Sequence, residues 1–298
     1  MALKGMSRLP LRALYGVSDM LALAAHSVVR YRRKVVRQNL KECFPDMDKR
    51  ELRRVEKAFY RFLTDYMMET VKLLSMSEEE MRRRLRVENP EVVTEAMRSG
   101  RNVVLYLGHY CNWEWVSSLP LSFDEGAVCA QVYHPLHNKE MDEAFMEIRT
   151  RFGANNIAMD DILRRLVEWK RAGTPTVTGF IADQSPNLDV HLFVDFLHHD
   201  TPVYTGPERI ARFLDAEVYY CDIRRPKRGE YVLRFEEITK TPKNEPTFAI
   251  TERYMQKLER SIKRHPEYWL WSHRRWKRTR ADFERKWGDK APEMLSHL

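Results

Sequence analysis

The middle of the chain alternates short apolar runs with stretches of helical periodicity, and this alternation limits the fold more than any other feature. The run NVVLYLG at 102–108 is uninterrupted by charge, as expected for a strand buried on both faces. Similar runs occupy 126–133, 176–181 and 217–222, and a more exposed strand pattern occupies 231–236. Helical spacing of apolar residues lies between them, at 112–119, 138–152, 159–172, 205–214 and 247–264. The sequence therefore predicts an α/β fold with a mixed, largely parallel central sheet flanked by helices.

Residues 1–85 show only helical patterns, and we expect a helical N-terminal region there, followed by an α/β domain over 86–298. Within the first region, Ser77 has Glu80 at the spacing of a capping box, which marks the start of a helix. There is no internal repeat and no Gly/Ser linker. The sequence therefore predicts one α/β domain with a helical extension.

The composition is that of an ordinary globular chain. Of 298 residues, 43% are hydrophobic, which excludes a disordered or low-complexity chain. The four cysteines are scattered without a CxxC pair, so a zinc ribbon and a disulfide framework are not expected, and a reducing compartment fits better. No uncharged apolar run reaches the roughly 18 residues of a membrane span, which excludes a multi-span membrane protein.

Lys and Arg outnumber Asp and Glu by 51 to 43, and basic residues are concentrated in two segments. One segment, 30–41, carries six basic residues and no acid; the other, WLWSHRRWKRTR at 269–280, places basic residues among Trp269, Trp271 and Trp276. Basic residues beside tryptophan suit a bilayer interface or a nucleic acid. For either segment alone, a solvated face with the tryptophans in the core is the alternative.

An apolar segment at 9–29 is interrupted by a polar residue at every seventh position. Arg12, Asp19 and His26 fall on one side of a helix, whereas most leucine, alanine and valine side chains gather on the other. This pattern is typical of an anchor helix that lies in a membrane interface, and a helix docked on its own domain is the alternative. The segment lacks the compact apolar run and the cleavage site of a signal peptide.

The chemistry is expected at the end of the first strand, in LYLGHYCNWEW. His109 follows that strand at its carboxyl edge, where open α/β sheets bind ligands. Asn112 can cap the next helix, which places Glu114 in the first turn, where its carboxylate can accept a hydrogen bond from the imidazole. Glu114 would then fix the tautomer and leave the second nitrogen of His109 as a general base. A buried, hydrogen-bonded histidine without a catalytic role is the alternative.

The segment GHYCNWEW resembles the His-x4-Asp/Glu motif of the glycerolipid acyltransferases. Its surroundings resemble the bacterial lipid A late acyltransferases, which are lauroyl and myristoyl transferases. Four more segments agree in order, so the similarity covers nearly the whole chain: VVRQNLKECFP at 35–45, ADQSP at 182–186, YTGPERIA at 204–211 and HPEYWLWSHRRWK at 265–277. The resemblance implies transfer of a fatty acyl group from an acyl-carrier-protein or acyl-CoA thioester to a lipid hydroxyl, without a cofactor. A lipid A precursor is the implied acceptor; an amino-acid lipid, a lysophospholipid or a phosphosugar lipid, and a lipid or thioester hydrolase, are alternatives.

The same resemblance implies roles for individual residues. His109 would deprotonate the acceptor hydroxyl, and Glu114 would hold the imidazole. In this family an arginine helps to position the substrate, and both Arg149 and Arg151 lie in the corresponding region. The remaining expected substrate-binding residues lie in the motif, in ADQSP and at a helix start that Thr205 can cap: Asn112, Trp113, Asp183, Gln184, Thr205 and Gly206.

Two neighbouring features are given no chemistry. Cys111 could be a nucleophile, but a small residue that fills a turn explains it better, because the family uses no nucleophile there. The run His198-His199-Asp200, with His191 upstream, has no cysteine or HExxH partner, so we expect no metal site.

The expected partners are acyl-carrier protein, an anionic lipid acceptor and a membrane surface. The expected location is the cytoplasmic face of the inner membrane, with peripheral attachment or a single N-terminal anchor. A nucleic acid is not expected as a partner, because nothing in the chain resembles a dedicated recognition motif.

Overall fold

A computed structural model describes residues 2–123, 128–133 and 138–296. Its main feature is a seven-stranded sheet in the order β1-β9-β8-β2-β5-β3-β4, in which β8 and β9 are antiparallel and all other neighbours are parallel. The predicted mixed, largely parallel sheet is thus confirmed. The strands of this sheet are β1 (Leu85–Val87), β2 (Val103–Leu107), β3 (Val128–Tyr133), β4 (Asn155–Ala158), β5 (Thr176–Ile181), β8 (Glu217–Lys227) and β9 (Glu230–Thr239).

The long apolar runs are strands, whereas several shorter strands were not predicted. β2 and β5 fall within the expected ranges, and β8 and β9 extend beyond them. The first two residues of the strand expected at 126–133 lie outside the described residues. β1 and β4 have only three or four residues and no apolar run, and the same holds for β6 (Phe193–Phe196) and β7 (His199–Pro202), which form a separate antiparallel hairpin.

Helices cover the sheet and form the N-terminal region. The segment expected as a helix at 112–119 is a 3-10 helix, η2 (Trp113–Ser122), which contains Pro120. Ser77 caps α5 as expected, because its Oγ accepts the Glu80 backbone N–H at 3.1 Å. The α-helices are α1 (Ala2–Ser7), α2 (Leu11–Leu23), α3 (Arg33–Cys43), α4 (Lys49–Leu73), α5 (Glu78–Arg84), α6 (Glu91–Arg98), α7 (Lys139–Thr150), α8 (Ile162–Arg171), α9 (Gly206–Leu214), α10 (Ala249–Arg264), α11 (Arg280–Trp287) and α12 (Ala291–Met294).

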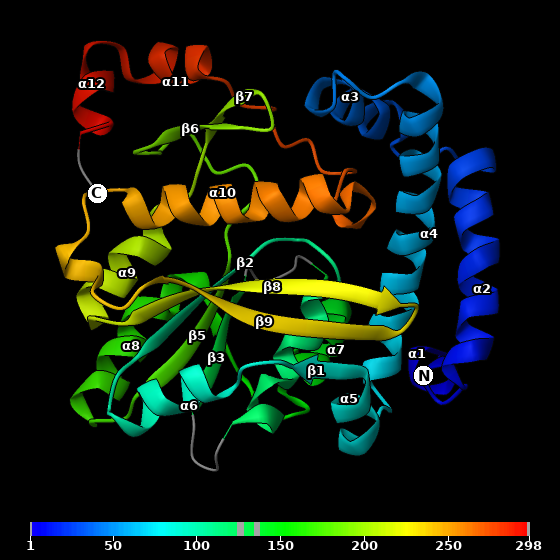
Figure 1. Cartoon of the computed structure of the whole chain (residues 1–298), viewed down its shortest axis with the longest axis horizontal. Helices are drawn as coiled ribbons and strands as arrows, with labels where there is room; N and C mark the ends of the chain where they lie inside the picture. The colour runs from blue at the N-terminus through cyan, green and yellow to red at the C-terminus, as the bar shows by residue number, and fades with distance from the viewer. Residues whose placement is uncertain (1, 124–127, 134–137, 297–298) are drawn as a thin grey trace.

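The end of β2 is held closely by α10. All five residues of β2 are buried, so both faces of the sheet are covered at this strand. α10 crosses the molecule beside β8, and the β6–β7 hairpin, α11 and α12 lie beyond it (Figure 1). The Tyr254 hydroxyl donates to the Leu107 carbonyl at 2.7 Å. A Cβ at Gly108 would lie 2.6 Å from Leu258 Cδ1 and 3.3 Å from Asp183 Oδ2, so a larger residue here would have to displace the Leu258 side chain.

The N-terminal helix α2 is docked on α4, and the two run side by side at one end of the molecule (Figure 1). Two of the three polar positions face α4: Asp19 pairs with Arg61 at 3.2 Å, and His26, in the π-helix η1 (Ala24–Val28) that continues α2, approaches Glu56 at 3.2 Å. Arg12 is exposed. The apolar side chains expected on the other side of the helix are divided, because Leu11 and Leu14 are buried whereas others point to solvent. Exposed apolar residues of α2, of η1 and of the position after η1 are Met20, Leu21, Leu23, Val28 and Val29. No helix among the described residues has the length and apolar character needed to cross a bilayer.

Two of the three tryptophans of the C-terminal basic segment are core residues, and Trp276 is partly buried against the core. Trp269 and Trp271 are 3% and 0% exposed, so for these two residues the alternative of tryptophans in the core is confirmed and contact with a bilayer or a nucleic acid is not. The segment lies against α3, because Asn39 Nδ2 donates to the Trp271 carbonyl at 2.9 Å and Arg32 Nη1 to the Ser272 carbonyl at 3.1 Å. The two basic segments, distant in sequence, are therefore neighbours in space.

Candidate active site

His109 and Asp183 meet at the carboxyl edge of the sheet. β2 and β5 are parallel neighbours with Leu107 opposite Ile181, so the residues two positions beyond each strand lie side by side. His109 Nδ1 is 2.6 Å from Asp183 Oδ1, and the His109 backbone N–H donates to Oδ2 at 2.8 Å. The register of two parallel strands thus supplies a carboxylate for the imidazole.

Asp183 is buried and surrounded by donors. Besides His109, Trp269 Nε1 donates to Oδ2 at 2.8 Å. Burial alone would raise the pKa of Asp183, but the charge and hydrogen bonds of His109 and the bond from Trp269 hold that pKa below its usual value. An ionised Asp183 accepts the Nδ1 proton and leaves Nε2 as the basic nitrogen of His109.

The expected hydrogen bond between Glu114 and His109 is wrong. Both oxygens of Glu114 accept from Arg149, with Nε to Oε2 at 2.9 Å and Nη2 to Oε1 at 2.7 Å. Asn112 does cap the helix as expected, because its Oδ1 accepts the Trp115 backbone N–H at 3.2 Å. In the resulting 3-10 helix, Glu114 turns to a largely buried guanidinium on α7, which needs a counter-charge.

The Glu114–Arg149 pair is a bidentate ion pair with little solvent around it. The two side chains are 3% and 20% exposed. Burial would lower the pKa of Arg149, but the hydrogen bonds and the charge of Glu114 raise it. The guanidinium also lies over the Phe145 ring, 5.1 Å from its centroid. Arg149 is thereby a fixed cation at the cavity wall.

The basic nitrogen of His109 faces a neighbouring amide. Gln184 Nε2 is 3.1 Å from His109 Nε2. Because the Nδ1 proton is donated to Asp183, Nε2 accepts this bond and the amide donates it. The Gln184 amide therefore occupies the hydrogen-bonding position of His109 Nε2.

His109 and Gln184 open onto a cavity of about 620 Å³. Its volume lies within the range of small-molecule sites, roughly 300–1,000 Å³. The polar groups are few, and most of the wall is aliphatic or aromatic. Apolar lining residues include Leu105, Leu107, Leu119, Val177, Ile162 and Phe180. The cavity thus combines a base with a long apolar surface.

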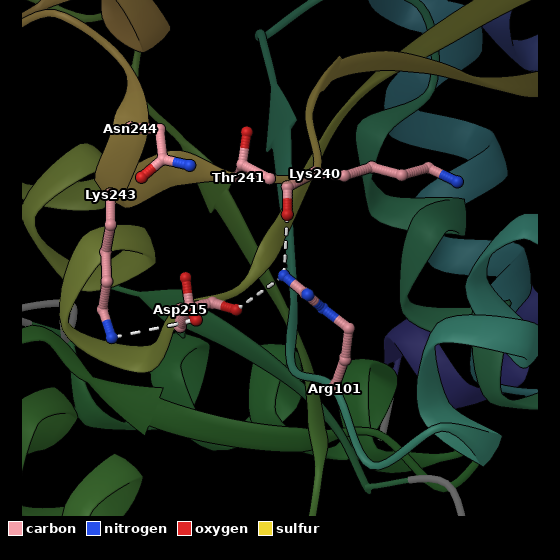
Figure 2. Close-up of a pocket in the computed structure, with 6 residues that line it drawn as sticks. All are labelled: Arg101, Asp215, Lys240, Thr241, Lys243 and Asn244. Atoms are coloured by element: carbon pink, nitrogen blue, oxygen red, sulfur yellow. Dashed lines mark hydrogen bonds and ion pairs between the residues drawn. The ribbon is translucent and has the colours of Figure 1, made fainter.

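A second, polar cavity of about 130 Å³ lies near the other end of β2 and lacks such features. Figure 2 shows its lining, in which Arg101 donates to the backbone carbonyls of Asp215 and Lys240, and Lys243 pairs with Asp215 at 3.8 Å. These groups already have partners, and no histidine lines the cavity. We therefore assign the chemistry to the His109 edge.

The structure brings most predicted site residues together. His109, Trp113, Glu114, Arg149, Gln184 and Gly206 line the cavity, and Asn112 and Asp183 are buried and linked to its lining by hydrogen bonds or neighbouring position. Arg151 does not join them, because its Nε and Nη2 donate to the Met76 carbonyl at 3.2 and 3.1 Å. Thr205 precedes α9, but its side chain makes no capping hydrogen bond, so that expectation is wrong.

Two aromatic residues that shape the site were not predicted from the sequence. Tyr66 of α4 stacks on Trp113 with ring centroids 4.1 Å apart, and its hydroxyl approaches Glu114 Oε1 at 3.5 Å. Trp269, which lies in the C-terminal basic segment, donates to Asp183. In the sequence, Tyr66 shows only the apolar spacing of its helix, which does not mark it as a site residue. Trp269 lies in 265–277, one of the segments that resemble the family, and this could have pointed to the site.

Cys111 has no nucleophilic geometry. It is buried with a φ of 53°, and its thiol donates to the Ile223 carbonyl at 3.4 Å. Burial raises the pKa of this thiol well above its ordinary value. In the part of the chain that the structure describes, no group of three His, Cys, Asp or Glu side chains could hold a metal ion.

A histidine held by a buried carboxylate, beside an apolar cavity at the carboxyl edge of an α/β sheet, is an arrangement for deprotonating a hydroxyl next to an apolar substrate. The family model of the bacterial lipid A biosynthesis acyltransferases matches residues 1–278, and the chain belongs to this family. It is therefore a lipid acyltransferase. A search of curated proteins returned no match.

Proposed function

We propose that the protein transfers a fatty acyl chain from an acyl-carrier-protein or acyl-CoA thioester to a hydroxyl of a lipid A precursor. The observation that carries this proposal is the His109–Asp183 pair, which faces a cavity with a largely apolar wall. The thioester is a co-substrate, and the proposed reaction uses no cofactor.

The proposed step is a direct attack. The acceptor hydroxyl displaces the Gln184 amide from His109 Nε2 and gives its proton to that nitrogen, while its oxygen bonds to the thioester carbonyl carbon. When the tetrahedral intermediate collapses, the C–S bond breaks and the imidazolium returns the proton to the thiolate. The products are an ester and a free thiol, and Asp183 stabilises the transient imidazolium without taking a proton.

Arg149 is proposed to position a negatively charged part of the substrate. Glu114 fixes its guanidinium at the cavity wall by two hydrogen bonds and offsets part of its charge. Arg151 has no such role, since it is bound to the Met76 carbonyl. In this proposal Glu114 acts through Arg149 and not through His109.

A membrane-facing surface is proposed at the N-terminal region. Exposed Val28 and Val29 lie next to the basic segment 30–41, which packs beside the C-terminal basic segment. Exposed apolar side chains surrounded by basic residues are suited to bind an anionic lipid surface. We propose peripheral attachment to the cytoplasmic face of the inner membrane through this surface.

Vesicle sedimentation tests the surface. Val28→Glu/Val29→Glu should bind vesicles of phosphatidylglycerol about tenfold more weakly than the unmodified protein, because two apolar contacts with the membrane are lost. Leu163→Glu, at an exposed apolar position of α8, is the matched control and should bind normally. Equal binding by all three proteins would exclude this surface.

The transfer itself is tested with purified protein, lauroyl-acyl-carrier protein and a lipid A precursor, with products identified by mass spectrometry. His109→Ala should lower kcat by roughly 10³–10⁴-fold. Lysophospholipid and amino-acid lipid acceptors are run in parallel. Release of free fatty acid with no acylated lipid would show a hydrolase, and wild-type turnover by His109→Ala would exclude the proposed base.

A further inference from the structure

We propose that Glu69 of α4 is a positioning residue of the transfer site, which acts through Asn112, and that Tyr15 of the N-terminal helix α2 completes its set of hydrogen bonds. The inference rests on the proposed function, because it concerns the same site. It adds two residues that make no contact with the cavity.

Glu69 is completely buried, and hydrogen-bond donors surround its carboxylate. Oε1 accepts from the Tyr15 hydroxyl at 2.8 Å, and Arg225 Nη2 lies 3.5 Å from the same oxygen. Oε2 accepts from Asn112 Nδ2 and from the Tyr231 hydroxyl, both at 2.7 Å. Four elements, α2, β8, β9 and the turn before η2, thus meet at one side chain.

The carboxylate determines which way the Asn112 amide points. A carboxylate only accepts, so the amide NH₂ must face Glu69, and the amide oxygen is left to accept the Trp115 backbone N–H at 3.2 Å. The backbone carbonyl of Glu69 also accepts from Trp115 Nε1 at 3.3 Å. The residues on both sides of Trp113 and Glu114 are therefore held by Glu69.

A packing role alone would not explain this residue. Burying an ionisable group is costly, and an apolar side chain of similar size would serve packing as well or better. Burial raises the pKa of Glu69, while Arg225 and the hydrogen bonds from Tyr231, Tyr15 and Asn112 oppose that rise. Several donors are directed at this one carboxylate, and the geometry therefore points to Glu69 as the residue that orients the motif.

Tyr15 connects this support to the helix with the exposed apolar residues. Arg228 lies over the Tyr15 ring, 4.3 Å from its centroid, and also pairs with Asp65 and Asp19. A Cβ at Gly229 would lie 2.2 Å from the Tyr15 hydroxyl, so the β8–β9 turn fits closely around it. α2 leads through the following π-helix to Val28 and Val29, so the helix that supports the catalytic motif is continuous with the segment proposed to contact the membrane.

Steady-state kinetics with lauroyl-acyl-carrier protein test the role. Glu69→Gln should lower kcat by roughly 10–100-fold with KM changed less than about twofold, because the motif is misplaced while the cavity wall remains. Tyr15→Phe, a milder change that keeps the ring packing, should lower kcat by roughly 3–10-fold. In an Asn112→Ala background, Glu69→Gln should have little further effect, because both act on one contact.

Glu56→Gln is the matched control. Glu56 is another buried α4 glutamate, and it binds Arg33 and Arg37 of α3 without contacting the motif. The Glu56→Gln variant should lose a similar free energy of unfolding to Glu69→Gln, yet keep the wild-type kcat. Equal losses of kcat in Glu56→Gln and Glu69→Gln, or additive losses with Asn112→Ala, would overturn the proposal.

Hydrogen exchange measured by mass spectrometry separates this proposal from the proposed function. Tyr15→Phe and Glu69→Gln should speed exchange in a peptide spanning 109–118, and Glu56→Gln should not. If the unmodified protein transfers no acyl group, the proposed function fails. The exchange result still decides whether Glu69 and Tyr15 are coupled to the segment 109–118. Unchanged exchange in both variants would overturn the coupling whatever the activity.

Discussion

Two buried carboxylates, Asp183 and Glu114, lie beside the end of β2 and hold different partners. Asp183 accepts hydrogen bonds from the His109 imidazole, the His109 backbone N–H and the Trp269 indole, none of which is a permanent cation. Glu114 accepts twice from one guanidinium. A carboxylate beside an imidazole sets its tautomer, whereas a carboxylate beside a permanent cation fixes the position of that cation. The sequence spacing of a motif therefore does not say which of these two tasks its acid performs.

Asp183→Asn should have the largest effect among changes to the two acids. The His109 backbone N–H and Trp269 Nε1 both donate to Oδ2, so the amide oxygen must take that place and the amide NH₂ must face Nδ1. The wrong tautomer of His109 is then favoured, and kcat should fall on the order of 10³-fold. Steady-state kinetics measure it, and a loss below tenfold would contradict the assignment.

Glu114→Gln should have an intermediate effect. One oxygen still accepts from Arg149, but the second hydrogen bond and the charge are lost, so the cation moves and turnover should fall by roughly 10–100-fold. The same kinetic assay compares it with Asp183→Asn. A loss larger than that of Asp183→Asn would reverse the two roles.

His273, which lies near Asp183, should make the free energy of unfolding depend on pH. Its Nε2 accepts the Ser185 backbone N–H at 3.2 Å, and burial is the main cause that lowers the pKa of His273 to about 4; Arg275, His109 and Lys277 act in the same direction, and Asp183 opposes. Between this value and an unfolded pKa of about 6.5, the unfolded state binds more protons than the folded state. The free energy of unfolding therefore falls as the pH drops through that window, and the contribution of His273 is fully present above it.

The expected loss between about pH 7 and pH 5 is on the order of 1–2 kcal/mol, reduced because the side chain is partly exposed. Urea unfolding at both pH values measures it. His273→Gln should lose less stability over the same interval, since it removes the titrating group. Identical pH dependence in both proteins would show that His273 is not responsible.

Arg151→Gln should have the smallest effect. Arg151 is two residues from Arg149, but it binds a backbone carbonyl outside the cavity lining. Turnover should stay within about twofold of the unmodified protein, while Arg149→Gln leaves Glu114 buried without its partner and should lower it strongly. Comparable losses from the two arginines would remove the distinction between them.

The parts of the fold with a strong local signal could be predicted. Uninterrupted apolar runs predict β2 and β5, and His109 and Asp183 each follow the end of one of these runs. Their direct contact could not be predicted, because it depends on β5 being next to β2 and on the register of Leu107 against Ile181. The partner of Glu114 depends likewise on where α7 packs.

The N-terminal region shows the same limit. The heptad spacing of Asp19 and His26 correctly marks one face of a helix, but that face binds α4 through Arg61 and Glu56. A polar stripe has the same pattern whether its side chains meet water or pair with a neighbouring helix. The support given by Glu69 has no sequence signal at all, because its partners come from four separate segments.

The central claim, that Asp183 and not Glu114 orients the catalytic imidazole, is tested most directly by NMR of ¹⁵N-histidine-labelled protein. The Nδ1–H proton of His109, assigned by its absence in His109→Gln, should be strongly hydrogen-bonded in the unmodified protein and in Glu114→Gln. In Asp183→Asn this signal should disappear and Nε2 should carry the proton. Loss of the signal in Glu114→Gln with its retention in Asp183→Asn would contradict the claim.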